Sequence, residues 1–125
     1  MRLKRAVFRQ LVGEALDALP DGFRPHLENV AITVEDWPSL DDLTAAGLDP
    51  DNETLFGLYV GVPLPERNDS NTLEFPDRII IYQGPIEDEH KSAEAIRREV
   101  QATVVHEIAH FFGFSEEYLA ELGWG

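Results

Sequence analysis

The sequence contains no cysteine. This absence excludes a disulfide framework and any metal site built from thiolates, so histidine and carboxylate side chains are the ligand types that remain. Basic residues are also scarce, because 24 acidic residues stand against 10 lysines and arginines and give a net charge of -14. Such a chain lacks the basic surface that binds phosphate backbones, so we expect no nucleic-acid partner.

Long apolar runs are missing as well. No stretch reaches the length of a transmembrane helix. Residues 1–5 are basic like the start of a signal peptide, but Arg9, Gln10 and Glu14 interrupt the apolar stretch that such a peptide requires. We therefore expect a cytoplasmic protein without a membrane partner. The 125 residues, 43% of them hydrophobic, suffice for one modest core, which predicts a single domain over residues 1–125.

The most specific pattern is His-Glu-x-x-His at residues 106–110, inside a helical periodicity that ends at Gly113. Two histidines four residues apart lie one turn apart on the same face of a helix, so both imidazoles can reach one ion. Glu107 follows the first histidine, which places its carboxylate beside the metal, close enough to take a proton from water there. The pattern predicts a zinc site with His106 and His110 as ligands and Glu107 as the catalytic base.

The alternative is that the motif is accidental. His106 and His110 would then be core or surface histidines with satisfied hydrogen bonds, and Glu107 an exposed helix residue. The flanking residues are almost all apolar, so polar side chains among them need a reason to be there. A bound metal supplies that reason, and we favour it.

A catalytic zinc site usually has three protein ligands and one open position for water, so a third ligand is needed. Gly113 can end the helix and turn the chain back, and Glu116 follows six residues after His110. The full string matches the long metzincin motif, with an acid in place of its third histidine. We predict Glu116 as the third ligand. Glu117 is an alternative, and Glu121 is a weaker one. A further alternative is that neither Glu116 nor Glu117 binds the metal.

The rest of the pattern predicts an α+β domain with a small sheet. We expect helices over about residues 3–19 and 92–112, strands over 30–34, 55–62 and 78–82, and a short C-terminal helix beginning at Ser115. The last strand is apolar throughout, which is typical of a strand in the middle of a sheet. Loops are expected over residues 35–54, with room for one helical turn, and over 63–77.

Glycines and tyrosines offer further candidates. Gly57 and Gly61 either allow another segment to approach the strand closely or mark bulges, and this strand is a candidate wall for an extended substrate. Tyr59, Tyr82 and Tyr118 are candidate hydrogen-bond donors to an oxyanion, although tyrosines more often pack in a core. The histidines at 26 and 90 have no ligand spacing and are predicted to be surface residues.

The chain resembles the small bacterial zincin-like proteins, or minimal metalloproteases, single domains once catalogued as a domain of unknown function. Residues 58–64, 76–86, 106–113 and 122–124 carry this resemblance. It implies a minimal zincin-like fold, with a small, mostly three-stranded sheet packed on an N-terminal helix and a long His-Glu-x-x-His helix. It also implies zinc at His106 and His110, Glu107 as acid and base, and an acid near position 116 as third ligand.

Two functions follow from these patterns. The first is a zinc-dependent peptidase that acts on a peptide or protein substrate, and the presence of Glu107 favours it. The second is a weak or inactive zincin-like domain that binds metal and serves as an adaptor, which the small size favours. Iron, manganese or nickel are alternative metals for such ligands. Neither the substrate nor the oligomeric state follows from the sequence.

Overall fold

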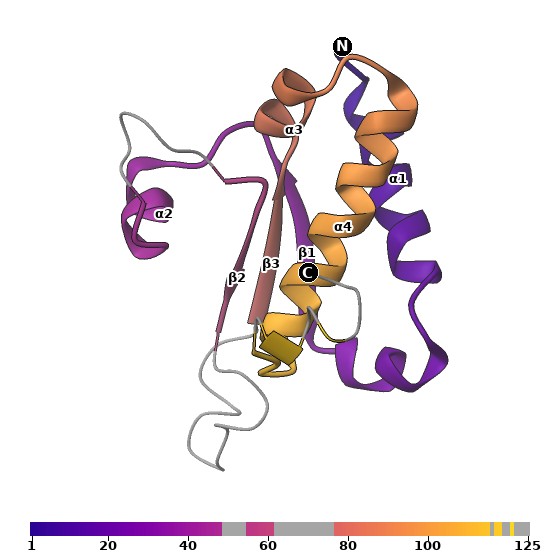
Figure 1. Cartoon of the computed structure of the whole chain (residues 1–125), viewed down its shortest axis with the longest axis vertical. Coiled ribbons are helices and arrows are strands. Elements are labelled where there is room, and N and C mark those ends of the chain that lie inside the picture. Colours follow the sequence, from indigo (N-terminus) through magenta and orange to yellow (C-terminus); the bar gives the residue numbers. More distant parts are fainter. Residues whose placement is uncertain (49–54, 62–76, 116, 119–120, 122–125) are drawn as a thin grey trace.

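The computed structural model describes residues 1–48, 55–61, 77–115, 117–118 and 121. Its helices and strands form an α+β domain with one small sheet (Figure 1). They are α1 (Arg5–Asp17), the 3-10 helix η1 (Asp21–Leu27), β1 (Val30–Glu35), α2 (Leu40–Ala45), β2 (Gly57–Val60), β3 (Asp77–Tyr82), α3 (Gln83–Glu89) and α4 (Ala93–Phe111).

The three strands form one mixed sheet in the order β1-β3-β2. β3 pairs in parallel with β1 and antiparallel with β2, so that Ile79 lies opposite both Ile32 and Tyr59. The predicted central position of the apolar strand is confirmed. Residues 79–82 are fully buried, because β3 has a strand on each side and is covered on both faces.

Two helices cover one face of this sheet (Figure 1). α1 contacts α4, and α4 contacts both β2 and β3. The helices contribute apolar side chains at spacings of three and four residues, which place them on one side of each helix. These side chains form the core with the inward residues of β3: Phe8, Val12, Ala15, Ile79, Ile81, Ile96, Val100, Val104 and Ile108. The core therefore fixes the long axis of α4 against the sheet.

Three helical elements depart from the sequence predictions. Residues 21–27 and 40–45 form η1 and α2, and α3 begins directly after β3. The dipeptide Gly84-Pro85 lies in the first turn of α3. Proline is tolerated there because the first-turn N–H groups have no partner within the helix. The Gly84 N–H instead donates to the Asp36 carbonyl oxygen at 2.7 Å.

Some predictions fall on residues outside the described ranges. Residues 62–76, which make up almost all of the long predicted loop, lie outside them, and so do Glu116 and residues 122–124. Of the short C-terminal helix, Glu117, Tyr118 and Glu121 are described and are helical. In the described part of the chain, no helix has both the length and the apolar character needed to cross a membrane.

Candidate metal centre

α4 carries the His-Glu-x-x-His motif in its last two turns, and both of its ends are capped. At the start, the Ser92 hydroxyl accepts a hydrogen bond from the Ala95 N–H at 3.1 Å. At the end, Gly113 takes a positive φ of 77°, and its N–H donates to the His110 carbonyl oxygen at 2.9 Å. The Phe114 N–H donates to Ala109 at 3.0 Å, which completes a Schellman motif. The glycine thus ends the helix as the sequence predicts.

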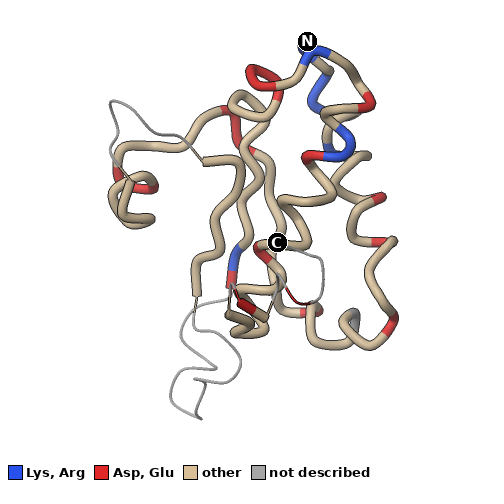
Figure 2. Tube along the Cα trace, viewed as in Figure 1, with Lys and Arg blue, Asp and Glu red and all other residues tan. Residues whose placement is uncertain are grey.

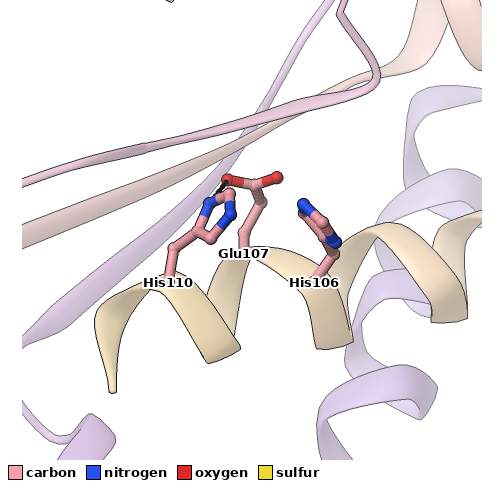
Figure 3. A group of neighbouring side chains, drawn as sticks. All are labelled: His106, Glu107 and His110. Carbon is pink, nitrogen blue, oxygen red and sulfur yellow. Dashed lines mark hydrogen bonds and ion pairs between the residues drawn. The ribbon is translucent and has the colours of Figure 1, made fainter. Parts of the chain in front are cut away.

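The three motif residues that carry ligand atoms point to the same side of α4 (Figure 3). The ligand atoms of His106, Glu107 and His110 all lie within 4.8 Å of one another. The two imidazole rings are 4.5 Å apart between centroids, and His110 Nδ1 lies 3.2 Å from Glu107 Oε1. The structure therefore brings together the three residues that the spacing predicts.

The exposure of these side chains differs in a way that suits a metal site. Glu107 is buried, with 7% of its surface exposed, whereas His106 and His110 are half-buried. A charged carboxylate at that depth is costly unless cations or hydrogen-bond donors compensate it. Two imidazoles beside it form a donor set suited to a divalent ion, so the residues present fit a metal such as zinc.

β2 packs closely against the buried side chain of Glu107 because Gly57 has no side chain. A Cβ atom at Gly57 would lie 2.7 Å from Thr103 Cγ2 and 3.1 Å from Glu107 Cγ. Such distances are shorter than normal packing permits. The sequence analysis offered Gly57 as a point where another segment approaches the strand closely. That segment is the polar side of α4. Thr103, which sequence reasoning missed, packs in this gap one turn before Glu107.

A chain of hydrogen bonds continues along the same side of α4. Thr103 Oγ1 donates to Glu99 Oε2 at 3.4 Å, and Glu99 Oε1 lies 2.9 Å from His90 Nε2. His90 is half-buried and not a surface residue as predicted, because it packs at the junction of α3 and α4. The spacing of residues 99, 103 and 107 is the sequence signal for this line, since positions four apart share a helix face.

The three candidate tyrosines have separate environments. Tyr82 is fully buried and donates to Asp42 Oδ2 at 2.7 Å, and its burial together with this bond raises the pKa of the phenol. Tyr59 donates to Asp77 Oδ2 at 2.9 Å, next to the end of β2. Tyr118 is exposed. The bond to Asp42 gives Tyr82 a structural role, with its hydroxyl directed at α2.

Glu116, the predicted third ligand, lies outside the described residues. Glu117 and Glu121 are exposed, and neither belongs to the group of three ligand residues found in the described part of the chain. Ser115 Oγ accepts a hydrogen bond from the Tyr118 N–H at 3.1 Å. Ser115 therefore caps the short C-terminal helix, as the sequence predicts.

A His-Glu-x-x-His helix packed against a small mixed sheet is the arrangement that defines a zincin-type protein. The comparison with protein families agrees with this class. The chain belongs to the zincin-like metallopeptidase family, whose model matches residues 27–124. That range includes all three strands and the whole of α4.

A solved structure has the same fold. It is a conserved hypothetical protein from Thermus thermophilus, 23% identical in sequence, with a TM-score of 0.59. The match covers 95% of this chain and 99% of that one. At this level of identity the likeness concerns the fold alone. No curated protein matches the chain.

Proposed function

We propose that this protein is a zinc-dependent peptidase in which His106 and His110 hold the metal and Glu107 moves protons. The observation that carries the proposal is the buried Glu107 carboxylate, which lies between the two imidazoles and beneath β2. A structural metal site needs only ligands and no general base. In the proposed site Glu107 is not a ligand, so its presence favours catalysis. We propose Glu116 as the third ligand, on the sequence argument alone.

Zinc, when bound, would lower the pKa of a coordinated water and polarise the carbonyl of the scissile peptide bond. Glu107 accepts a proton from the attacking water as its oxygen forms a bond to the carbonyl carbon. Glu107 then delivers that proton to the amine nitrogen as the C–N bond breaks. Burial of this carboxylate keeps bulk water away from the proton it carries.

The proposed substrate is an extended peptide that lies along β2. β2 is an edge strand of the sheet, so the backbone groups on its outer side can pair with an added strand. Gly57 on this strand lies over Glu107, which brings such a peptide close to the motif. No lysine or arginine follows Arg98 in the sequence, whereas several glutamates do. The charged residues that follow Arg98 in sequence are thus all acidic, which favours a metal ion and disfavours nucleic acid.

Substitution of Glu107 by glutamine tests the catalytic role directly. The zinc-loaded E107Q variant should keep its metal, because both histidines remain, but its hydrolysis of a broad peptide mixture should fall about 10² to 10⁴-fold. The readout is the rate of new peptide termini measured by mass spectrometry. E94Q is the matched control, because Glu94 lies exposed in the first turn of α4 and should leave the rate unchanged.

Two outcomes would count against this function. Equal turnover by E107Q would remove Glu107 from the mechanism. Complete inactivity of the zinc-loaded wild type over the whole mixture would favour the adaptor role over the peptidase role.

A further inference from the structure

A groove runs along the outer edge of β1, on the side of the sheet away from β2. Two adjoining hollows of about 350 and 390 Å³ lie there, and Leu16 of α1 and Ile32 of β1 line both of them. Their other walls come mainly from the same two elements. α1 runs antiparallel to β1 here, because residues near 9–13 face the far end of the strand and residues 16–17 face its start.

The core is incompletely covered along this edge. Val30, Ile32 and Val34 point inward in alternation, yet each is only half-buried, whereas the inward residues of β3 are fully buried. β1 also pairs with β3 residue by residue without a bulge, and it contains no proline. Bulges and prolines are the features with which proteins usually protect an edge strand from added strands. This edge is therefore suited to pairing.

We propose that a second copy of this chain occupies the groove and joins the two sheets through antiparallel β1 strands. In a two-fold arrangement centred on Ile32, that residue lies opposite its own copy and Val30 lies opposite Val34 of the partner. The paired side chains on the inward face are therefore apolar along the whole length of the two strands. This register also keeps the two copies of Glu35 apart. Val34 already accepts a hydrogen bond from Arg5 at 2.9 Å, which is compatible with pairing because a carbonyl has two lone pairs.

α1 is self-complementary about the same axis. Gly13 lies on the groove, and nothing in the described residues lies within 4 Å of the position its Cβ would take. A glycine inside a helix is unfavourable on its own, so the fold of a single copy gives no reason for it. In the dimer it allows the two α1 helices to approach closely. Arg9 lies four residues before Gly13, and Asp17 lies four residues after it. In the dimer, Arg9 of each copy lies opposite Asp17 of the other copy.

The charges favour this occupant over an unrelated peptide. A net charge of -14 opposes association of two copies in general, so a stable contact needs local attraction. Two reciprocal pairs between Arg9 and Asp17 supply it, and they exist only when the partner is a second copy in this orientation. The edge of β2 stays open in such a dimer, because it is the opposite edge of the sheet, and the motif lies next to β2 (Figure 1).

A charge swap tests the proposal with surface residues, independently of any peptidase activity. Sedimentation equilibrium of the full chain over a wide concentration range should show a reversible dimer. R9D and D17R should each raise the dimer dissociation constant about tenfold, because two ion pairs become two like-charge pairs. The double variant R9D/D17R should restore the wild-type value. R98D is the matched control on exposed α4 and should leave the constant unchanged.

A monomer at every concentration would overturn the proposal. So would a dimer that R9D and D17R leave intact, since its interface would lie elsewhere. Failure of the double variant to recover, with its helical circular dichroism unchanged, would also contradict the reciprocal pairing.

Discussion

Replacement of Gly57 would disturb the candidate metal centre without changing any candidate ligand. A methyl group there would collide with Thr103 and press on Glu107, so G57A should destabilise the fold by about 1–3 kcal/mol and weaken zinc binding. Chemical denaturation and zinc titration measure the two effects. G22A is the matched control, because nothing lies within 4 Å of the Cβ it would add.

The same contact predicts a rescue. T103S removes the Cγ2 methyl group that lies nearest to the added Cβ, so G57A/T103S should recover much of the stability lost in G57A. If the two changes are additive, the steric explanation is wrong and Gly57 is needed for another reason, such as backbone conformation.

At this scale the sequence predicted which three motif side chains lie together, and it did not predict which residues surround them. The spacing of His106, Glu107 and His110 on a helix is a local property, so it could be predicted from the sequence. The contacts of Gly57 with Thr103 and of Tyr59 with Asp77 join separate elements, and no local pattern encodes them. The role of Glu116 stays a prediction.

Among the elements, α4 carries the motif near its end, and its two ends can be changed separately. S92A removes the hydroxyl that caps the first turn and should cost about 1 kcal/mol of stability. G113A forces a side chain into a left-handed conformation and should cost about 1–2 kcal/mol. The first change lies at the far end of the helix, whereas the second lies in the turn that follows His110.

The two variants should therefore differ in metal affinity. We expect G113A to weaken zinc binding, because fraying of the last turn displaces His110, and S92A to leave it unchanged. Competitive titration against a chelator, done alongside denaturation, separates the two quantities. Equal loss of affinity in both variants would mean that affinity follows overall stability and not the local order of the last turn.

Element boundaries followed from the sequence where a strong period was present. α1, β1, β3 and α4 agree with the predicted ranges within two residues at each end. α3 was not predicted, and α2 was expected only as one helical turn within a loop, since each is a short helix in an acidic or proline-containing stretch. α3 depends on its surroundings: Gln83 is buried and bonds to Arg5 at 2.7 Å and to Leu3, far away in sequence. Such a helix is stabilised by tertiary contacts more than by its own sequence.

For the molecule as a whole, charge is distributed unevenly. Most lysines and arginines lie near the start of α1 and the first half of α4, and acidic residues occur throughout (Figure 2). The motif lies at the other end of α4, away from most of the basic residues. The fold class and the mixed character of the small sheet agree with the zincin-like family. The single-domain expectation and the cytoplasmic location stay predictions.

The topology of the sheet could not be predicted from the sequence. Each strand could be recognised separately from its own residues. The order of the three strands in the sheet could not, apart from the central strand, whose residues are apolar on both faces. β3 was placed correctly because its residues are apolar on both faces. The parallel pairing with β1 had no local signal, and the groove along β1 is a consequence of that pairing.

The central claim is that His106 and His110 bind zinc, and metal content tests it most directly. Elemental mass spectrometry of purified, zinc-supplied protein should find about one zinc per chain, as expected of a single mononuclear site, and H110A should lose it. H26A, which changes an exposed histidine outside the motif, should keep the metal. Zinc absent from the wild type, or retained in full by H110A, would contradict the account.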